Sequence, residues 1–78
     1  MPTGRQIKAA RILLGIEQRQ LAEQAGVNAS TLSRMEQSGA KTVRGQGRSI
    51  QAVVDALERN GVVIDPDGLR LKPKKRLR

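Results

Sequence analysis

The sequence predicts a mainly α domain of four helices, followed by a short C-terminal β-hairpin. Apolar residues follow helical spacing within residues 18–37 and again within residues 50–57, so they fall on one face of each helix. The β-branched run at 62–64, the turn sequence Asp-Pro-Asp-Gly at 65–68 and the alternation at 69–71 indicate two short strands joined by a turn.

The first helix is expected to follow Thr3 and to run to about Leu14. Thr3 is a preferred N-cap residue, and Gln6 stands three positions later, where it completes a capping box. Gly15 ends the helix. Four residues share its inward side: Ile7, Ala10, Arg11 and Leu14.

Residues 18–24 and 29–37 predict two short helices joined by a tight turn. Gly26 stands where the earlier helix must stop and the chain must reverse, so we expect it to adopt a positive φ. Asn28 or Ser30 can cap the later helix by accepting a hydrogen bond from a free backbone N–H. This arrangement is typical of a DNA-reading helix-turn-helix, whose second helix lies in the major groove. The alternative is a helical hairpin that only packs.

The segment 38–47 contains three glycines and no periodicity, and it is expected to be a loop. A fourth helix should start near Arg48 or Ser49, with its apolar residues at helical spacing on the inward side. The pair Asn60-Gly61 closes this helix, because glycine is the usual residue after a helix end.

In the hairpin that follows, Pro66 fixes φ at the second turn position and Gly68 permits a positive φ. A lone two-stranded hairpin is marginal in water, so it should pack on the fourth helix, pair with another subunit, or both. We therefore divide the chain into a helical domain over residues 1–60, a hairpin over 61–72 and a basic, disordered tail over 73–78.

The composition excludes several classes of function. The chain has 78 residues, which gives room for one domain with a small core. It has no Phe, Tyr or Trp, so it lacks the aromatic platforms on which readers of RNA and single strands stack bases. The lack of Cys and His excludes thiol chemistry, Cys-type zinc sites and the commonest general base. No apolar run is long enough for a signal peptide or a membrane span. We expect a cytoplasmic protein that is not an enzyme and uses no metal, cofactor or membrane.

The formal net charge is +8, but most of it lies at the C-terminal end. Residues 70–78 hold six basic side chains and no acid, whereas the rest of the chain holds nine basic and seven acidic side chains. Residues 28–48 are more informative, because four basic residues there face only one acid, Glu36. A local basic excess beside the proposed reading helix is what neutralisation of DNA phosphates requires.

The outer side of the third predicted helix carries the candidate DNA-reading residues. Arg34 can take guanine O6 and N7 in a bidentate contact, Asn28 can contact adenine or a phosphate, and Ala29 can touch a thymine methyl. Ser30 and Ser33 share this side of the helix. The plain alternative is that Asn28 and Ser30 only cap the helix and that Arg34 is solvated.

The sequence Leu-Ala-x-x-Ala-Gly-Val at 21–27, followed by Thr-Leu-Ser-Arg-x-Glu at 31–36, resembles the phage repressor/Cro family of helix-turn-helix domains, the XRE-type regulators. The resemblance covers about residues 4–60 and implies a four-helix, repressor-like fold. It also implies where the base-reading positions of the family fall in this chain: Asn28, Ala29, Ser30 and Arg34.

The same resemblance implies roles for polar residues outside the reading helix. Gln18 would bond a DNA phosphate, and Arg11 would pair with Glu36, tying the first helix to the end of the third. The plain alternative for that pair is two solvated charges. Glu17 departs from the family, which usually has Ser or Thr there as a cap. Glutamate caps poorly and repels a phosphate.

Five residues are candidates for contact with the DNA backbone: Gln18, Gln37, Lys41, Arg44 and Arg48. For the cations among them, a solvated loop is the plain alternative. The glycine-rich segment 44–48 lacks the Gly-Lys-Ser/Thr sequence and the preceding strand of a phosphate-binding P-loop. The tail at 74–78 can add nonspecific affinity for DNA or for anionic lipid, or can only increase solubility.

Together these observations predict a sequence-specific transcriptional regulator that binds double-stranded DNA, a repressor in a bacterium or phage. We expect a homodimer formed through residues after Asn60, because the run 62–64, Leu69 and Leu71 would be exposed in a monomer. The competing picture is a monomer whose hairpin folds back on the fourth helix. The alternative function is a helix-turn-helix module that binds another protein, as an antitoxin or antiactivator does. A nonspecific nucleoid protein driven by the tail is a third hypothesis.

Overall fold

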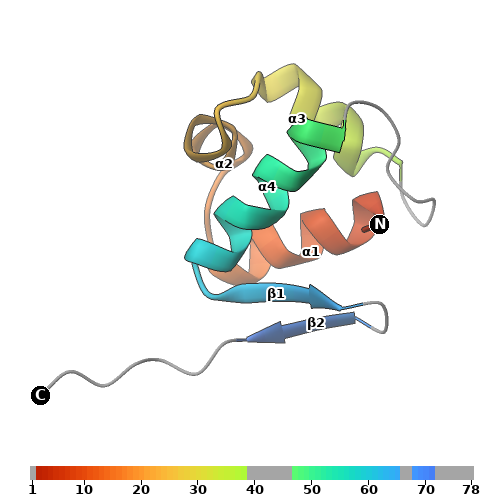
Figure 1. Ribbon diagram of the computed structural model, residues 1–78, viewed down its shortest axis with the longest axis vertical. Helices are drawn as coiled ribbons and strands as arrows, with labels where there is room; N and C mark the ends of the chain where they lie inside the picture. Colours follow the sequence, from red (N-terminus) through yellow and green to blue (C-terminus); the bar gives the residue numbers. More distant parts are fainter. Residues whose placement is uncertain (1, 39–46, 66–67, 72–78) are drawn as a thin grey trace, which may run out of the picture.

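The computed structural model describes residues 2–38, 47–65 and 68–71. In these residues the chain forms four helices and then a two-stranded antiparallel sheet, with all four helices on one side of the hairpin (Figure 1). The expected mainly α fold with a C-terminal hairpin is therefore confirmed. The elements are α1 (Gly4–Leu14), α2 (Gln18–Ala25), α3 (Ala29–Glu36), α4 (Gly47–Arg59), β1 (Val62–Asp65) and β2 (Gly68–Leu71).

The core is aliphatic, because the chain has no aromatic side chains to fill it. Every helix and strand β1 contribute at least one side chain with no exposed surface. The largest of these side chains are Ile7 of α1, Leu21 of α2, Leu32 of α3, Val53 and Leu57 of α4, and Val62 of β1. Each helix thus buries one face against the others, which fixes the face that remains in solvent.

The helices α1 and α2 end in the same way, at Gly15 and Gly26. Both glycines have a φ of 72°, in the left-handed region that favours glycine. In each case the residue after the glycine donates its N–H to a carbonyl five positions back. The N···O distance is 3.3 Å from Ile16 to Arg11 and 3.0 Å from Val27 to Ala22. Ile16 and Val27 then pack against the core. The positive φ expected at Gly26 is confirmed, and this end geometry sets the direction in which α3 leaves α2.

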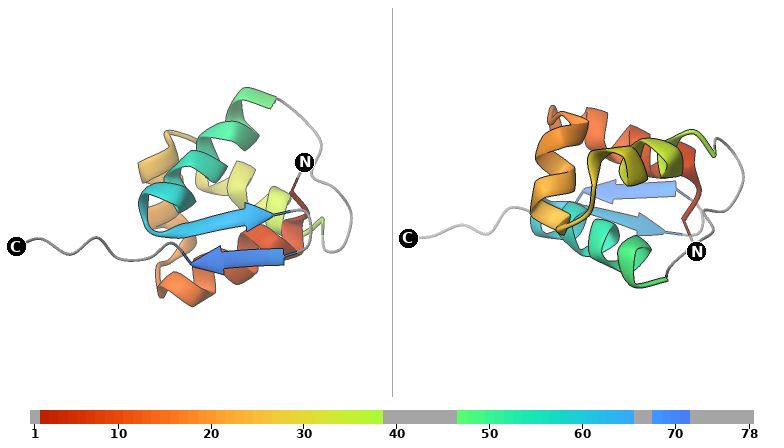
Figure 2. Two further views of the ribbon diagram at one scale, coloured as in Figure 1. Left: turned by 60° about the horizontal axis from the view of Figure 1, so that its bottom comes forward. Right: turned by 90° about the horizontal axis from the view of Figure 1, so that it is seen from above.

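The hairpin folds back onto the helices of its own chain. Strand β1 contacts α1 and α4, and strand β2 lies beside α1 (Figure 2). Val62 is fully buried, and Ile64 and its cross-strand partner Leu69 pack against the core. The expectation that Val62, Ile64 and Leu69 would be exposed in a monomer is therefore wrong, whereas Val63 is half-buried and does not belong to the core. Leu71, at the end of β2, is exposed as expected.

One side chain links the start of α1 to the hairpin. Gln6 closes the expected capping box with Thr3, with N···O distances of 2.9 and 3.1 Å, so that prediction is confirmed. The amide nitrogen of Gln6 also donates to the carbonyl of Asp65, at the end of β1, over 2.9 Å. A residue expected to stabilise only the helix start therefore also holds the hairpin in place.

The helix bounds differ from the expected ones by single residues. Helix α2 runs to Ala25, directly before the left-handed glycine, and α3 ends at Glu36 rather than at residue 37. Helix α4 begins at Gly47, one residue before the expected start, a difference of the size that helix ends commonly show. The tail at 73–78 and the turn residue Pro66 lie outside the described residues.

Candidate nucleic-acid interface

Helix α3 has one buried face and one free face. Leu32, Met35 and Glu36 are buried against the other helices. The opposite face carries four exposed residues that the sequence singled out: Asn28, Ala29, Ser30 and Arg34. Because the buried face is held by the core, the free face is presented to solvent on a rigid base.

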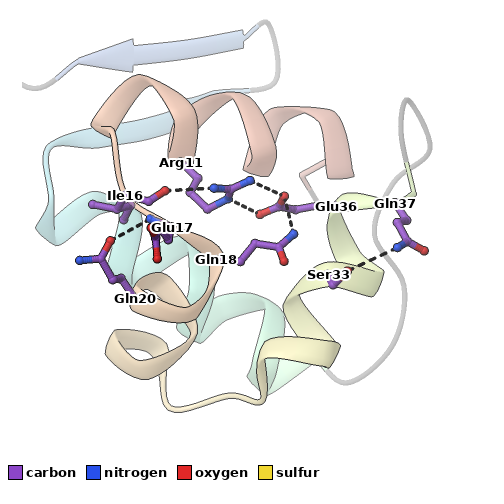
Figure 3. Close-up of polar contacts among 8 residues, drawn as sticks. All are labelled: Arg11, Ile16, Glu17, Gln18, Gln20, Ser33, Glu36 and Gln37. Carbon is purple, nitrogen blue, oxygen red and sulfur yellow. Dashed lines mark hydrogen bonds and ion pairs between the residues drawn. The ribbon is translucent and has the colours of Figure 1, made fainter.

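Ser33 and Gln37 lie at the edge of this free face. Ser33 is half-buried rather than fully outward, so its expected place on the outer side is only partly correct. Its hydroxyl lies 3.4 Å from the amide nitrogen of Gln37, which donates to it (Figure 3). Gln37 itself is exposed and follows the last residue of α3.

The start of α3 leaves the Asn28 side chain unused. Asn28 occupies the N-cap position, with an extended backbone at φ −73° and ψ 146°, but its side chain makes no capping hydrogen bond. Ser30 lies inside the helix, so its expected role as the cap is wrong, since the cap is the flanking residue with extended backbone. The amide of Asn28 is thus exposed beside the free N–H groups of the first turn.

A polar junction lies on the other side of α3. The guanidinium of Arg11 in α1 donates two hydrogen bonds to the carboxylate of Glu36 in a bidentate ion pair, with Nε···Oε2 at 2.8 Å and Nη2···Oε1 at 3.1 Å (Figure 3). The third nitrogen of Arg11 donates to the carbonyl of Ile16 over 3.0 Å. The side chains of Arg11 and Glu36 are only 14% and 3% exposed. The two residues are therefore paired and largely removed from water.

Gln18 joins the same junction from α2. Its amide nitrogen donates to Oε1 of Glu36 over 3.0 Å. One carboxylate at the end of α3 thus accepts hydrogen bonds from α1 and from the first residue of α2. In the part of the chain that the structure describes, no buried side-chain nitrogen or oxygen lacks a partner. This junction, defined by Arg11, Gln18 and Glu36, fixes how α3 sits against the two preceding helices.

The start of α2 contains a residue that sequence reasoning missed. The side chain of Gln20 accepts a hydrogen bond from the backbone N–H of Glu17 over 2.9 Å. The signal was available, because Gln20 follows Glu17 at the same spacing as Gln6 follows Thr3. The departure from the family at Glu17 therefore does not leave the helix start without side-chain support.

Two exposed cations are candidates for contact with DNA: Arg34 on the free face of α3 and Arg48 in the first turn of α4. Arg34 and Arg48 are both exposed, and among residues 2–38, 47–65 and 68–71 neither forms an ion pair. Their charges remain available to an anion. Lys41 and Arg44, the other two expected backbone contacts, lie outside the described residues.

Two further surveys cover the described residues. No group of three or more His, Cys, Asp or Glu side chains there is arranged to hold a metal ion. None of the described helices has the length and apolar character needed to cross a membrane.

Comparisons with known proteins agree with this arrangement. Residues 7–42 match the family model described as helix-turn-helix. The match includes most of α1, all of α2 and α3, and hence the junction and the free face together. A comparison with curated proteins finds no match.

Proposed function

We propose that the chain is a sequence-specific transcriptional regulator that binds double-stranded DNA, since residues 7–42 match the helix-turn-helix family model. The family supports DNA binding by a regulator. The proposal adds that α3 enters the major groove and reads base edges there.

The observation that carries the proposal is the contrast on α3 between a satisfied face and an unsatisfied one. Arg34 is exposed and has no ion-pair partner among the described residues, so its guanidinium is free for the O6 and N7 atoms of a guanine. Asn28 is exposed without a capping bond, which leaves its amide free for an adenine or a phosphate. Ala29 and Ser30 complete the reading surface.

Three described residues would position the protein on the DNA backbone: Gln18, Gln37 and Arg48. The side-chain NH₂ of Gln18 donates one hydrogen to Glu36, which leaves its second hydrogen for a phosphate oxygen. Gln37 and Arg48 are exposed at the end of α3 and the start of α4. Contacts of this kind fix register on the duplex without reading sequence.

We further propose that the protein is a repressor, acts as a homodimer and works in the bacterial cytoplasm, where the DNA lies. A small DNA-binding domain acts most simply by occupying its site and keeping polymerase from it. A two-fold dimer would place two copies of α3 one DNA turn apart, about 34–36 Å, and would require a near-palindromic site.

The decisive experiment is selection of bound sequences from a pool of random duplexes, followed by affinity measurements at several salt concentrations. We expect one enriched, near-palindromic sequence. We also expect log K to fall linearly with log salt, with a slope of about −0.9 for each neutralised phosphate.

Two other outcomes would replace the proposal. Failure to enrich any sequence, together with a stoichiometric protein complex, would favour the protein-binding alternative. Binding without sequence preference that disappears when residues 72–78 are deleted would favour a nonspecific nucleoid protein. The matched control is the full chain with its tail intact, tested on the same random pool.

A further inference from the structure

The end of helix α2 is held by two side chains from the end of α4. Arg59, the last residue of α4, donates through Nη2 to the backbone carbonyl of Gln24 over 3.0 Å. The next residue, Asn60, donates through its side-chain nitrogen to Oε1 of Gln24 over 2.6 Å. The end of α4 therefore lies beside the end of α2 and contacts both the main chain and the side chain of one residue (Figure 2). We call Gln24, Arg59 and Asn60 the α2–α4 clasp.

The carbonyl of Gln24 is one of the last-turn carbonyls that a helix cannot satisfy by itself. The two carbonyls before it accept the N–H groups of Gly26 and Val27, in the turn that follows. The last turn of α2 contains no basic residue of its own, so the cation that favours a helix C-terminus comes from α4. Arg59 therefore completes a helix end that the local sequence leaves incomplete.

Asn60 does more than close α4, which is the role expected from the sequence. Its side-chain nitrogen donates to the carbonyl of Ala56 over 2.7 Å as well as to Gln24. The side-chain NH₂ of asparagine has two hydrogens, so both bonds can form at once. The bond to Ala56 fixes the orientation of the amide on α4, and the other hydrogen is thereby directed toward α2.

The clasp lies just before the turn that leads into the reading helix. Gln24 is the second-to-last residue of α2, and α3 begins five positions later, at Ala29. The other end of α2 is held by Gln18, which belongs to the junction with α1 and α3. Helix α2 is thus fixed at its start by the junction and at its end by α4. Because the turn between α2 and α3 is short, the position of α2 also determines where α3 lies.

The effect of the clasp on geometry should exceed its effect on stability. Its bonds from α4 to Gln24 lie at the exposed surface, where water competes for the same groups, so they stabilise the fold little. Helix α4 also carries Arg48, a candidate contact to the DNA backbone, about 16 Å from Arg59 along the helix at 1.5 Å per residue. The clasp therefore holds α3 and Arg48 in one rigid arrangement. A binding surface needs its groups held to within about 0.5 Å of the productive geometry.

We propose that the α2–α4 clasp positions the reading helix for DNA, so that Gln24, Arg59 and Asn60 are positioning residues that touch neither base nor phosphate. The proposal rests on the proposed function, because it concerns how α3 and Arg48 are aligned on one duplex. Loss of the clasp releases the end of α2 from α4 and lets α3 shift relative to Arg48. Affinity for the selected DNA site should then fall, although every group that contacts DNA is still present.

Arg59→Met tests the clasp in the full chain, because methionine keeps a long side chain in the helix but donates no hydrogen bond. We expect an about threefold to tenfold weaker affinity for the selected duplex, the effect of one lost hydrogen bond. The slope of log K against log salt should not change, whereas loss of a phosphate contact would reduce its magnitude by about 0.9.

The matched control is Arg5→Met, on α1. It removes the same charge from an exposed residue that forms no ion pair within the described residues. Its affinity for the duplex should stay within about twofold of the parent, because a distant exposed charge is largely screened by salt.

A measurement without DNA separates the clasp from the proposed function. In two-dimensional NMR spectra of the free protein, Arg59→Met should shift the backbone amide signals of residues 26–30 more than those of residues 4–10 in α1. Arg59→Lys keeps a donor for the carbonyl of Gln24, so it should restore both these signals and the affinity for DNA.

Far-UV circular dichroism shows whether each variant is folded. If Arg59→Met unfolds, Gln24→Ala takes its place, because it removes only the side-chain bond to Asn60 and alanine favours a helix. A folded variant that binds DNA as well as Arg5→Met does, or whose amide signals at residues 26–30 stay in place, would overturn the proposal. A smaller salt slope for Arg59→Met would also overturn it and make Arg59 a phosphate contact. Shifted amide signals that Arg59→Lys restores, in a protein that enriches no DNA sequence, would refute the proposed function and leave the clasp as the contact that positions α3.

Discussion

The two faces of α3 differ in how completely their polar groups are satisfied. On the inner face the carboxylate of Glu36 accepts hydrogen bonds from Arg11 and Gln18 and is almost fully buried. On the outer face Arg34, two residues earlier, is exposed and unpaired within the described residues. One helix of eight residues thus carries a carboxylate that fixes its own position in the fold and a guanidinium that is free to contact a DNA base. Substitutions on the two faces should therefore separate stability from DNA recognition.

The largest effect is expected for Glu36→Gln. The substitution leaves the buried guanidinium of Arg11 without its counter-charge, and breaking one member of such a pair costs about 3–5 kcal/mol. Thermal and urea unfolding followed by far-UV circular dichroism measure the loss. A chain this small has little stability to spare, so we expect much of it to be unfolded at room temperature.

The control for Glu36→Gln is the double variant Arg11→Met with Glu36→Met. Replacing a buried pair by apolar residues of similar size is often neutral or stabilising, so much of the lost stability should return. If Glu36→Gln melted at the parent temperature, the pair would not determine how α3 is held, and the contrast between the two faces would be wrong.

The next largest effect is expected for Arg34→Ala, and it should appear in DNA binding alone. Loss of a bidentate contact to guanine costs about 1–3 kcal/mol on the selected site and relaxes the preference at one base pair. Competition binding with single-base variants of the site measures both. The melting temperature should change little, because Arg34 is exposed and forms no ion pair within the described residues.

Arg34→Lys separates base reading from phosphate binding. Lysine keeps the charge but loses the planar fork, so a base reader should lose preference at the same base pair while keeping the salt dependence. Unchanged sequence preference in Arg34→Ala, with normal folding, would remove Arg34 from the reading surface and return it to the solvated alternative.

The sequence predicted the parts of the fold that depend on local chemistry. The capping box at Thr3 and Gln6 and the glycine-ended turn at Gly26 involve residues a few positions apart, so their types and spacing specify the geometry. The helix-turn-helix followed from these signals, and the family match supports it. The half-buried place of Ser33 was missed because helical spacing alone does not say how far a neighbouring helix reaches.

The place of the hairpin could not be predicted in the same way. Alternation over residues 62–64 indicates a strand, but it does not say whether the partner surface belongs to the same chain. The contact that fixes it, from Gln6 to the carbonyl of Asp65, joins residues 59 positions apart. Likewise the hydrogen bond from Gln18 to Glu36 depends on how two helices cross, so the sequence suggested only the phosphate role.

A smaller, mixed effect is expected for Gln18→Ala, because Gln18 belongs to both the junction and the proposed DNA surface. Loss of its bond to Glu36 should lower stability by about 1 kcal/mol, since the carboxylate keeps both hydrogen bonds from Arg11. Affinity should fall by a similar factor for every DNA sequence, as expected of a backbone contact.

Gln20→Ala is the matched control for Gln18→Ala. It removes the support of the α2 start at Glu17 without touching the junction. It should therefore lower stability to a similar extent but leave the DNA affinity of the folded protein unchanged. A Gln18→Ala protein whose sequence preference shifts at one base pair would instead make Gln18 a base reader.

The smallest effect is expected for the stability of Asn28→Ala, and it sharpens the comparison at the start of α3. Asparagine at an N-cap normally contributes about 1 kcal/mol through its side-chain bond, but Asn28 makes none. We therefore expect the free energy of unfolding to change by no more than about 0.5 kcal/mol, the range of ordinary surface substitutions.

The control for Asn28→Ala is Thr3→Ala. The hydroxyl of Thr3 accepts the N–H of Gln6 over 3.1 Å, so this variant should lose about 1 kcal/mol of stability. Urea unfolding of the two variants side by side decides the role of Asn28. An equal loss in both would make Asn28 a cap and leave its amide unavailable to DNA, whereas a loss in Thr3→Ala alone keeps that amide on the reading surface.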